Sequence, residues 1–153
     1  MVSMTLRKQV DAPPERVFDV ASDFANAGRN IRAITSLEVL TAGPIGVGTR
    51  FRETRTMFGR PATEEMVIIG FERPRSYTVG CENHGCTYRT EFRFEPTAGG
   101  TEIAMTFEAV PRTLAAKVMG FLLRPLLRKC IKETEKDLDD LKAVAEGRPT
   151  QAP

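Results

Sequence analysis

Six strand-like segments follow one another between residues 34 and 110, and this pattern constrains the fold more than any other feature of the sequence. The segments are rich in Thr, Val, Ile, Phe and Tyr, and short turn clusters separate them: AGPIGVG, FGRP, ERPRS, ENHG and EPTAGG. Because strands joined by short connections pair with their neighbours, the pattern predicts an antiparallel meander. A further strand predicted over residues 5–10 brings the sheet to about seven strands.

Side chains alternate along these segments, which gives the predicted sheet one apolar and one charged face. If ENHG is a four-residue loop, its hairpin pairs residues of the apolar face with one another. The predicted pairs are Cys81 with Cys86 and Val79 with Tyr88. Parity across the next turn places Phe92 opposite Met105, on the same apolar face.

Residues 11–30 predict two short helices after the first strand. Pro13 and Pro14 have the fixed φ angle that suits a helix start. Four apolar residues then fall at helical spacing and form one stripe. They are Val17, Val20, Ala21 and Phe24. Gly28 is expected to end the second helical turn.

A long helical region is predicted over residues 113–145. Its core-facing residues recur at alternating steps, namely Leu127, Ile131, Thr134, Leu138, Leu141 and Ala145. The ring of Pro125 excludes the carbonyl four residues earlier, which predicts a short helix over residues 113–123 followed by the main helix. Together these elements predict an α+β fold in which the sheet curls around the long C-terminal helix.

Length and composition bound the function classes. A chain of 153 residues fits a single domain, expected over residues 1–146, and GRPTQAP at residues 147–153 has the composition of a disordered tail. A net charge of +2 is too small to indicate a nucleic-acid binder. We expect a cytoplasmic protein, because we find neither a signal peptide nor an apolar run long enough to span a membrane.

Five stretches in this order resemble the polyketide cyclase/dehydrase and lipid-transport family, part of the helix-grip superfamily that includes START domains and plant pollen allergens. They are DAPPERVFDVASDF, VGTRFRE, GFERPRSY, RFEPTAGGTEIAM and LLRPLLRKCIKETEKDLDDLKAVAE. The resemblance covers roughly residues 3–146 and implies a START-like domain with a hydrophobic ligand between sheet and helix. Many members carry tryptophans after the first helix, whereas this chain has NAGRNIRAI there and no Trp.

The stretch CENHGC places Cys81, Cys86 and the chain's one histidine, His84, within six residues. A zinc site needs four ligands, and this hairpin offers three with no evident fourth, so we expect no metal site. We interpret the cysteines as thiols of a cytoplasmic protein, and a reversible disulfide stays the alternative. A Ser-His-Asp or Cys-His arrangement is nearly excluded, because His84 is predicted at a loop tip.

The third strand, TRFRETRTMF, could carry polar chemistry in the cavity. If Phe51 faces the cavity, Glu53, Arg55 and Met57 do so too, and the Glu–Arg pair could orient a ligand or act as acid and base. In the alternative register the inward residues are Arg50, Arg52 and Thr54.

The residues favour a binding protein over an enzyme, with no cofactor. The preferred ligand is a small hydrophobic or amphipathic molecule such as a polyketide, a quinone or a lipid. The alternatives are a cyclase or dehydratase that uses Glu53, Arg55 or Tyr88, and a module that binds a partner through the charged outer face of the sheet. The expected ligand-binding residues are Phe51, Glu53, Arg55, Met57, Tyr77, Val79, Cys81, Tyr88, Thr90, Phe92, Ile103, Met105, Phe107, Leu122, Leu123, Leu127 and Ile131.

The segment at residues 111–132 contains six basic residues and no acidic one around the apolar stretch MGFLLRPLL. Two interpretations stay open. The segment is either a solvated basic face of a helix that closes the cavity, or a transient contact with an anionic membrane surface. The oligomeric state is expected to be a monomer or a homodimer.

Overall fold

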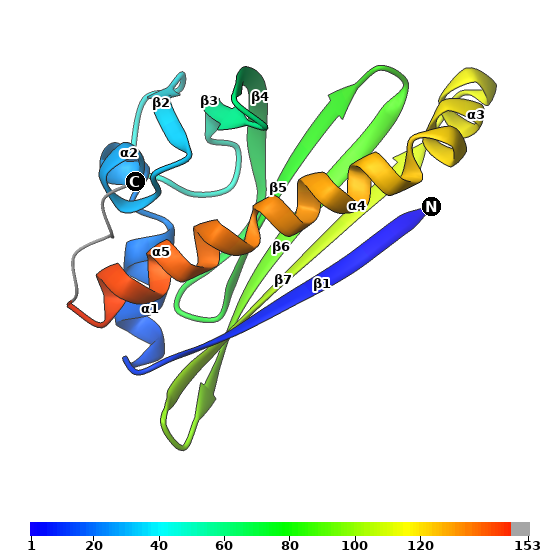
Figure 1. Cartoon of the computed structure of the whole chain (residues 1–153). Helices are drawn as coiled ribbons and strands as arrows, with labels where there is room; N and C mark the ends of the chain where they lie inside the picture. Colours follow the sequence, from blue (N-terminus) through cyan, green and yellow to red (C-terminus); the bar gives the residue numbers. More distant parts are fainter. Residues whose placement is uncertain (148–153) are drawn as a thin grey trace.

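The computed structural model describes residues 1–147 and shows an antiparallel sheet bent around a C-terminal helical region (Figure 1). The strands are β1 (Val2–Val10), β2 (Ile34–Val39), β3 (Arg50–Met57), β4 (Arg60–Glu72), β5 (Ser76–Asn83), β6 (Cys86–Thr97) and β7 (Gly100–Pro111). The helical elements are α1 (Pro14–Ala21), the 3₁₀ turn η1 (Phe24–Asn26), α2 (Ala27–Asn30), α3 (Leu114–Leu122), α4 (Arg124–Glu133) and α5 (Glu135–Ala145). The predicted disordered tail lies outside the described residues, except for Gly147.

The sheet order is β1-β7-β6-β5-β4-β3-β2, with every neighbouring pair antiparallel. The predicted α+β class, the seven strands and the two short helices after the first strand are therefore confirmed. Helices α4 and α5 run diagonally across the concave face of the sheet (Figure 1). Within residues 1–147, the helices are too short and too polar to cross a lipid bilayer.

The register at the CENHGC hairpin differs from the prediction. Asn83 pairs with Cys86, so the turn consists of His84 and Gly85 alone, and Cys81 pairs with Tyr88. Both turn residues have positive φ angles, 49° and 75°, which is the backbone of a two-residue hairpin turn. Val79 accordingly pairs with Thr90, and neither predicted pair forms. A shift of two residues preserves the faces, and the predicted pair of Phe92 and Met105 is confirmed.

The C-terminal helical region has one more break than predicted. The short helix α3 and the new start at Pro125 agree with the prediction, and Thr113 caps α3 by accepting a hydrogen bond from the Ala116 N–H. The main helix, however, stops at Glu133 and resumes at Glu135. The Thr134 hydroxyl and N–H both donate to the carbonyl of Ile131, and this tighter bonding ends α4.

The helical segment after β1 closes one end of the concave sheet. Val17, Ala21 and Phe24 of the predicted stripe are buried, and Phe18 adds an aromatic ring that packs edge-on against Phe94. Gly28 lies inside α2, which ends at Asn30, so the expected stop at Gly28 is wrong. These contacts hold α1 and η1 against the sheet, and α1 also packs against α5.

Candidate functional site

A cavity of about 420 Å³ lies between the concave face of the sheet and the helices α4 and α5. Residues of α1, η1, α2 and β2 close it at one end. The lining includes Ala62 and Glu64, which are exposed, so the cavity reaches the molecular surface beside the β3–β4 hairpin. Most of the remaining lining side chains are apolar, which is the composition of a site for a small organic ligand.

Many of the residues expected to bind a ligand line this cavity. They are Phe51, Glu53, Arg55, Met57, Tyr77, Val79, Thr90, Phe92, Met105, Phe107, Leu127 and Ile131. Strand parity explains the agreement, because alternate residues of β3, β5, β6 and β7 face the concave side. That they contact a ligand stays a prediction.

The structure places the other expected residues elsewhere. Ile103 is fully buried in the core, and Cys81 and Tyr88 form a cross-strand pair near the β5–β6 turn. Leu122 and Leu123 are exposed, because α3 lies at the end of the sheet formed by the β5–β6 turn (Figure 1). None of these five residues belongs to the cavity lining.

The third strand adopts the register that turns Glu53 and Arg55 inward. Phe51 is buried and shares their face, whereas Arg52 reaches Glu38 and Glu65 on the outer surface. The Arg55 guanidinium donates from Nε to Glu53 Oε1 at 2.8 Å and from Nη2 to Asp137 Oδ2 at 2.7 Å. One buried guanidinium therefore pairs with Glu53 on its own strand and joins β3 to α5 through Asp137.

Sequence reasoning missed Asp137, which is not among the residues expected to bind a ligand. The signal was available in the helical spacing, because Asp137 follows Thr134 by three residues and precedes Leu141 by four. All three residues line the cavity. An aspartate that continues an apolar stripe indicates a buried carboxylate with a specific partner.

Burial and charge act differently on the groups of this cluster. Burial opposes the charge of Arg55, but the carboxylates of Asp137 and Glu53 outweigh burial and raise the pKa of the guanidinium. Burial raises the pKa of Asp137 to about 6, against the lowering effect of Arg55. Arg55 thus stays charged, and Asp137 can exchange a proton near neutral pH.

The polar groups around the cluster are largely occupied, with one exception. The Tyr77 hydroxyl donates to the Ala21 carbonyl at 3.2 Å, and burial raises the pKa of this phenol. Asp140 accepts hydrogen bonds from the backbone N–H and the guanidinium of Arg32. The exception is Asp137 Oδ1, which is buried and has no hydrogen-bond partner among the described residues.

Cys81, near the β5–β6 turn, is a poorly reactive thiol. Burial and the Glu64 carboxylate raise the pKa of the Cys81 thiol to about 11, so little thiolate exists at neutral pH. Cys81, Cys86 and Cys130 are free thiols. Across residues 1–147, His, Cys, Asp and Glu side chains do not gather in a group that could hold a metal ion.

A seven-stranded curved sheet that grips a long helix and encloses a cavity defines the helix-grip class of proteins. The chain belongs to the polyketide cyclase/dehydrase and lipid transport family, whose model matches residues 1–146. The predicted resemblance is therefore confirmed. No curated protein sequence matches the chain.

Solved structures share this fold at low sequence identity. The protein TTHA0849 from Thermus thermophilus is 23% identical, with a TM-score of 0.77 over 95% of this chain and 98% of that protein. The allergen Ara h 8.0201 is 17% identical, with a TM-score of 0.66 over 95% of each chain. The di-domain ARO/CYC StfQ from the steffimycin biosynthetic pathway is 15% identical, with a TM-score of 0.78, and the match covers 95% of this chain and 51% of StfQ. At these identities the likeness concerns the fold.

Proposed function

We propose that the protein binds a small hydrophobic or amphipathic molecule, such as a polyketide, a quinone or a lipid, between the sheet and the C-terminal helices. The observation that carries this proposal is the cavity of about 420 Å³, with an apolar wall and one cluster of charged side chains. Ligand sites in proteins have this size and this division between apolar walls and few polar groups. Membership of the family supports the same class of ligand.

The entrance is proposed at the rim formed by residues 40–49, the β3–β4 turn and the segment before Pro125. Gly43, Gly48 and Gly59 have positive φ angles, and the side chain of Phe58 is exposed at the same turn. Ile45 packs against the core from this rim. Movement of these turns would widen the opening beside Ala62 and Glu64.

Binding can be tested with N-phenyl-1-naphthylamine, a neutral dye whose fluorescence rises in apolar surroundings. We expect saturable uptake of one dye molecule per chain, with a dissociation constant in the micromolar range or tighter, on the order of −8 kcal/mol. Isothermal titration checks the stoichiometry. Unsaturable binding, or no binding, would contradict the proposal.

An enzyme of the cyclase or dehydratase type is the second candidate. Asp137 supports it, because a carboxyl group with a pKa of about 6 beside a charged guanidinium can transfer a proton near neutral pH. Tyr88 lies outside the cavity lining, so this candidate depends on Glu53, Arg55 and Asp137. If Glu53→Gln and Arg55→Leu leave ligand affinity intact and candidate polyketides are not turned over, this candidate loses its support.

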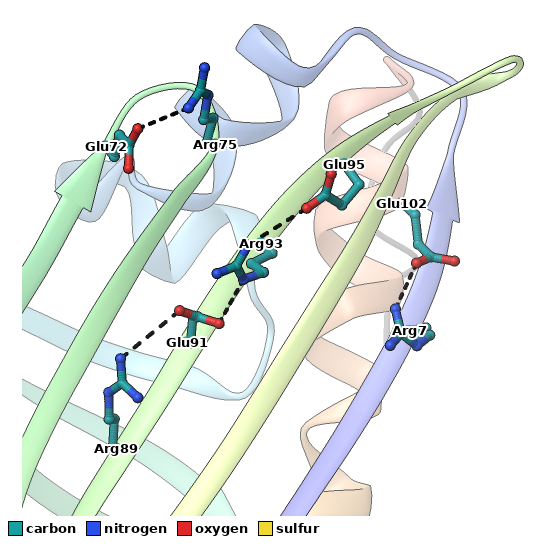
Figure 2. A network of polar contacts seen from close by, with 8 residues as sticks. All are labelled: Arg7, Glu72, Arg75, Arg89, Glu91, Arg93, Glu95 and Glu102. Atoms are coloured by element: carbon teal, nitrogen blue, oxygen red, sulfur yellow. Dashed lines mark hydrogen bonds and ion pairs between the residues drawn. The ribbon is translucent and has the colours of Figure 1, made fainter.

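The partner-binding alternative depends on the outer face of the sheet. The charged side chains of this face pair with one another (Figure 2). Arg93 Nε lies 2.9 Å from Glu91, and Arg7 Nη1 lies 2.8 Å from Glu102. Such mutual pairing is typical of a solvated face. Isolation of a stoichiometric partner that dissociates when the charge at position 93 is reversed by Arg93→Glu would favour the partner-binding alternative.

We further propose that α3 and the first turn of α4 touch an anionic membrane surface while the cavity exchanges its ligand. Leu114 and Phe121 are 78% and 72% exposed, and Val118 and Leu122 continue the same stripe at helical spacing. The opposite side of α3 carries the buried Ala116, which faces the β5–β6 turn. The helix is therefore anchored on one side and presents an apolar stripe on the other.

The positive charge around this apolar stripe favours contact with a membrane over contact with a second copy of the chain. The basic residues around it are Arg112, Lys117, Arg124, Arg128, Lys129 and Lys132, and residues 111–132 contain no acidic residue. Two copies that met through this face would bring like charges together, whereas anionic headgroups would compensate them. Leu127 and Ile131 of α4 line the cavity, so the same helix connects this surface to the ligand.

Vesicle sedimentation tests this contact with phosphatidylcholine vesicles that contain or lack about one-third phosphatidylglycerol. We expect binding to the anionic vesicles only, and Phe121→Glu should weaken it at least about tenfold, because a large apolar side chain is lost and a repelled charge is added. Ile69→Glu is the matched control, since Ile69 is an exposed apolar residue of the sheet. Equal binding of both variants, or a concentration-dependent dimer instead of vesicle binding, would contradict the proposal.

A further inference from the structure

The carboxylate of Asp137 is the most specific polar feature of the cavity. Asp137 is one of the lining residues, and its side chain is 13% exposed. Its Oδ2 atom accepts the hydrogen bond from Arg55, whereas its Oδ1 atom is buried and has no partner among residues 1–147. The carboxylate therefore accepts fewer hydrogen bonds than it can, and a ligand that supplies a donor to it would add one.

The charges around Asp137 define what that ligand group must be. Glu53 and Asp137 share the single positive charge of Arg55, so the cluster carries one excess negative charge when both carboxylates are ionised. The neighbouring Asp140 is paired with Arg32 and adds no uncompensated charge. Tyr77, also on this wall, already donates its hydroxyl proton to Ala21. The other acidic lining residues, Asp23 and Glu64, accept hydrogen bonds from Asn26 and Asn83.

We infer that the Asp137 carboxylate is the recognition point of the cavity, and that the ligand is an apolar molecule that carries a hydrogen-bond donor, either a hydroxyl or a protonated amine. The inference rests on the proposed ligand-binding function. An ionised carboxylate accepts hydrogen bonds and donates none, so a ligand that ends in a carboxylate or a ketone gains nothing from this group. A protonated amine would also compensate the excess charge of the cluster.

Competition between N-phenyl-1-naphthylamine and three decyl compounds tests the inference at pH 8, where Asp137 is ionised. We expect 1-decanol and decylamine to displace the dye at concentrations at least about tenfold lower than decanoate. Two variants distinguish a hydroxyl donor from a protonated amine. In Asp137→Asn the amide oxygen stays on Arg55 and the NH2 group, which only donates, replaces the other carboxylate oxygen, so the advantage of decylamine should fall most, because a hydroxyl can still accept a hydrogen bond and a protonated amine cannot. Asp137→Leu should abolish both preferences.

The outcomes separate this inference from the proposed function. If the dye binds but Asp137→Leu leaves the relative affinities of the three compounds unchanged, the inference is overturned. The proposal that the cavity binds a ligand is then unaffected. Tighter binding of decanoate than of decanol would also overturn it and would indicate Arg55 as the anchor. If the dye does not bind the wild type at all, the proposed function fails and the inference fails with it. Circular dichroism of Asp137→Asn, which preserves the side-chain shape, shows that an altered order does not come from unfolding.

Discussion

The Phe107→Arg variant is expected to remain folded and to lose uptake of N-phenyl-1-naphthylamine completely. Phe107 lies on β7, lines the cavity and is only partly buried. A guanidinium at this position would occupy space in the cavity and retain water there, because burial of an unpaired charge against an apolar wall is costly. The long arginine side chain can place its charge in the water of the cavity, so we expect the hydrophobic core to stay intact.

A matched control separates loss of the cavity from loss of the fold. Ile69→Arg introduces the same side chain on the outer side of the sheet, where Ile69 is 49% exposed and faces Gly80. We expect this control to bind the dye as the wild type does, and both variants to give the wild-type circular dichroism spectrum. Retention of dye by folded Phe107→Arg would show that the cavity is not the binding site.

Arg55→Leu is expected to lower the free energy of unfolding by about 3–5 kcal/mol. The Arg55 side chain is 15% exposed and pairs with two carboxylates that are about equally buried. Its removal leaves Glu53 and Asp137 close together without a positive charge between them. Urea denaturation gives the free energy of unfolding.

Arg52→Leu is the control for this experiment. Arg52 lies on the outer face of the same strand, is 45% exposed and pairs with Glu38 and Glu65. Its loss should change stability by no more than about 1 kcal/mol, because exposed ion pairs contribute little. A destabilisation by Arg55→Leu that is no larger than that of Arg52→Leu would refute the role assigned to the buried cluster.

The loss of stability in Arg55→Leu should depend on pH. The pKa of Asp137 is raised from 3.8 to about 6 in the folded protein, so its contribution to stability is full below about pH 4 and is lost as the pH rises through 6. Arg55 lowers this pKa, so removal of Arg55 should raise the pKa of Asp137 further. The loss of stability then becomes larger and continues to a higher pH. The difference in the free energy of unfolding between wild type and Arg55→Leu should therefore be larger at pH 8 than at pH 5. A larger difference at pH 5 would contradict this account.

Much of the cavity wall could be predicted from the sequence because strand periodicity is local. Phe51, Val79, Phe92 and Phe107 fall on one face by parity alone, and a register error of two residues at the CENHGC turn leaves that parity intact. The turn itself was harder to predict. His84 adopts the positive φ angle that a two-residue turn requires, which is uncommon for residues other than glycine.

The charged cluster could be predicted only in part, because it joins residues far apart in the chain. Glu53 and Arg55 follow from the parity of β3, but nothing local to either residue indicates that Asp137 lies 2.7 Å from the guanidinium. The break at Thr134 depends on a hydroxyl that bonds to the preceding turn, a choice that helical periodicity does not reveal. Leu122 and Leu123 are exposed at the C-terminal end of α3, and their apolar character alone does not distinguish such a place from the cavity wall.

Native mass spectrometry of the protein as purified from cells tests the central claim most directly. The account predicts that a fraction of the molecules carries a small non-covalent adduct, which is released on denaturation and has an apolar body with a hydroxyl or amino group. Phe107→Arg, purified in the same way, should carry no adduct. Bare wild-type protein, both as purified and after incubation with N-phenyl-1-naphthylamine, would contradict the claim that this cavity holds a ligand.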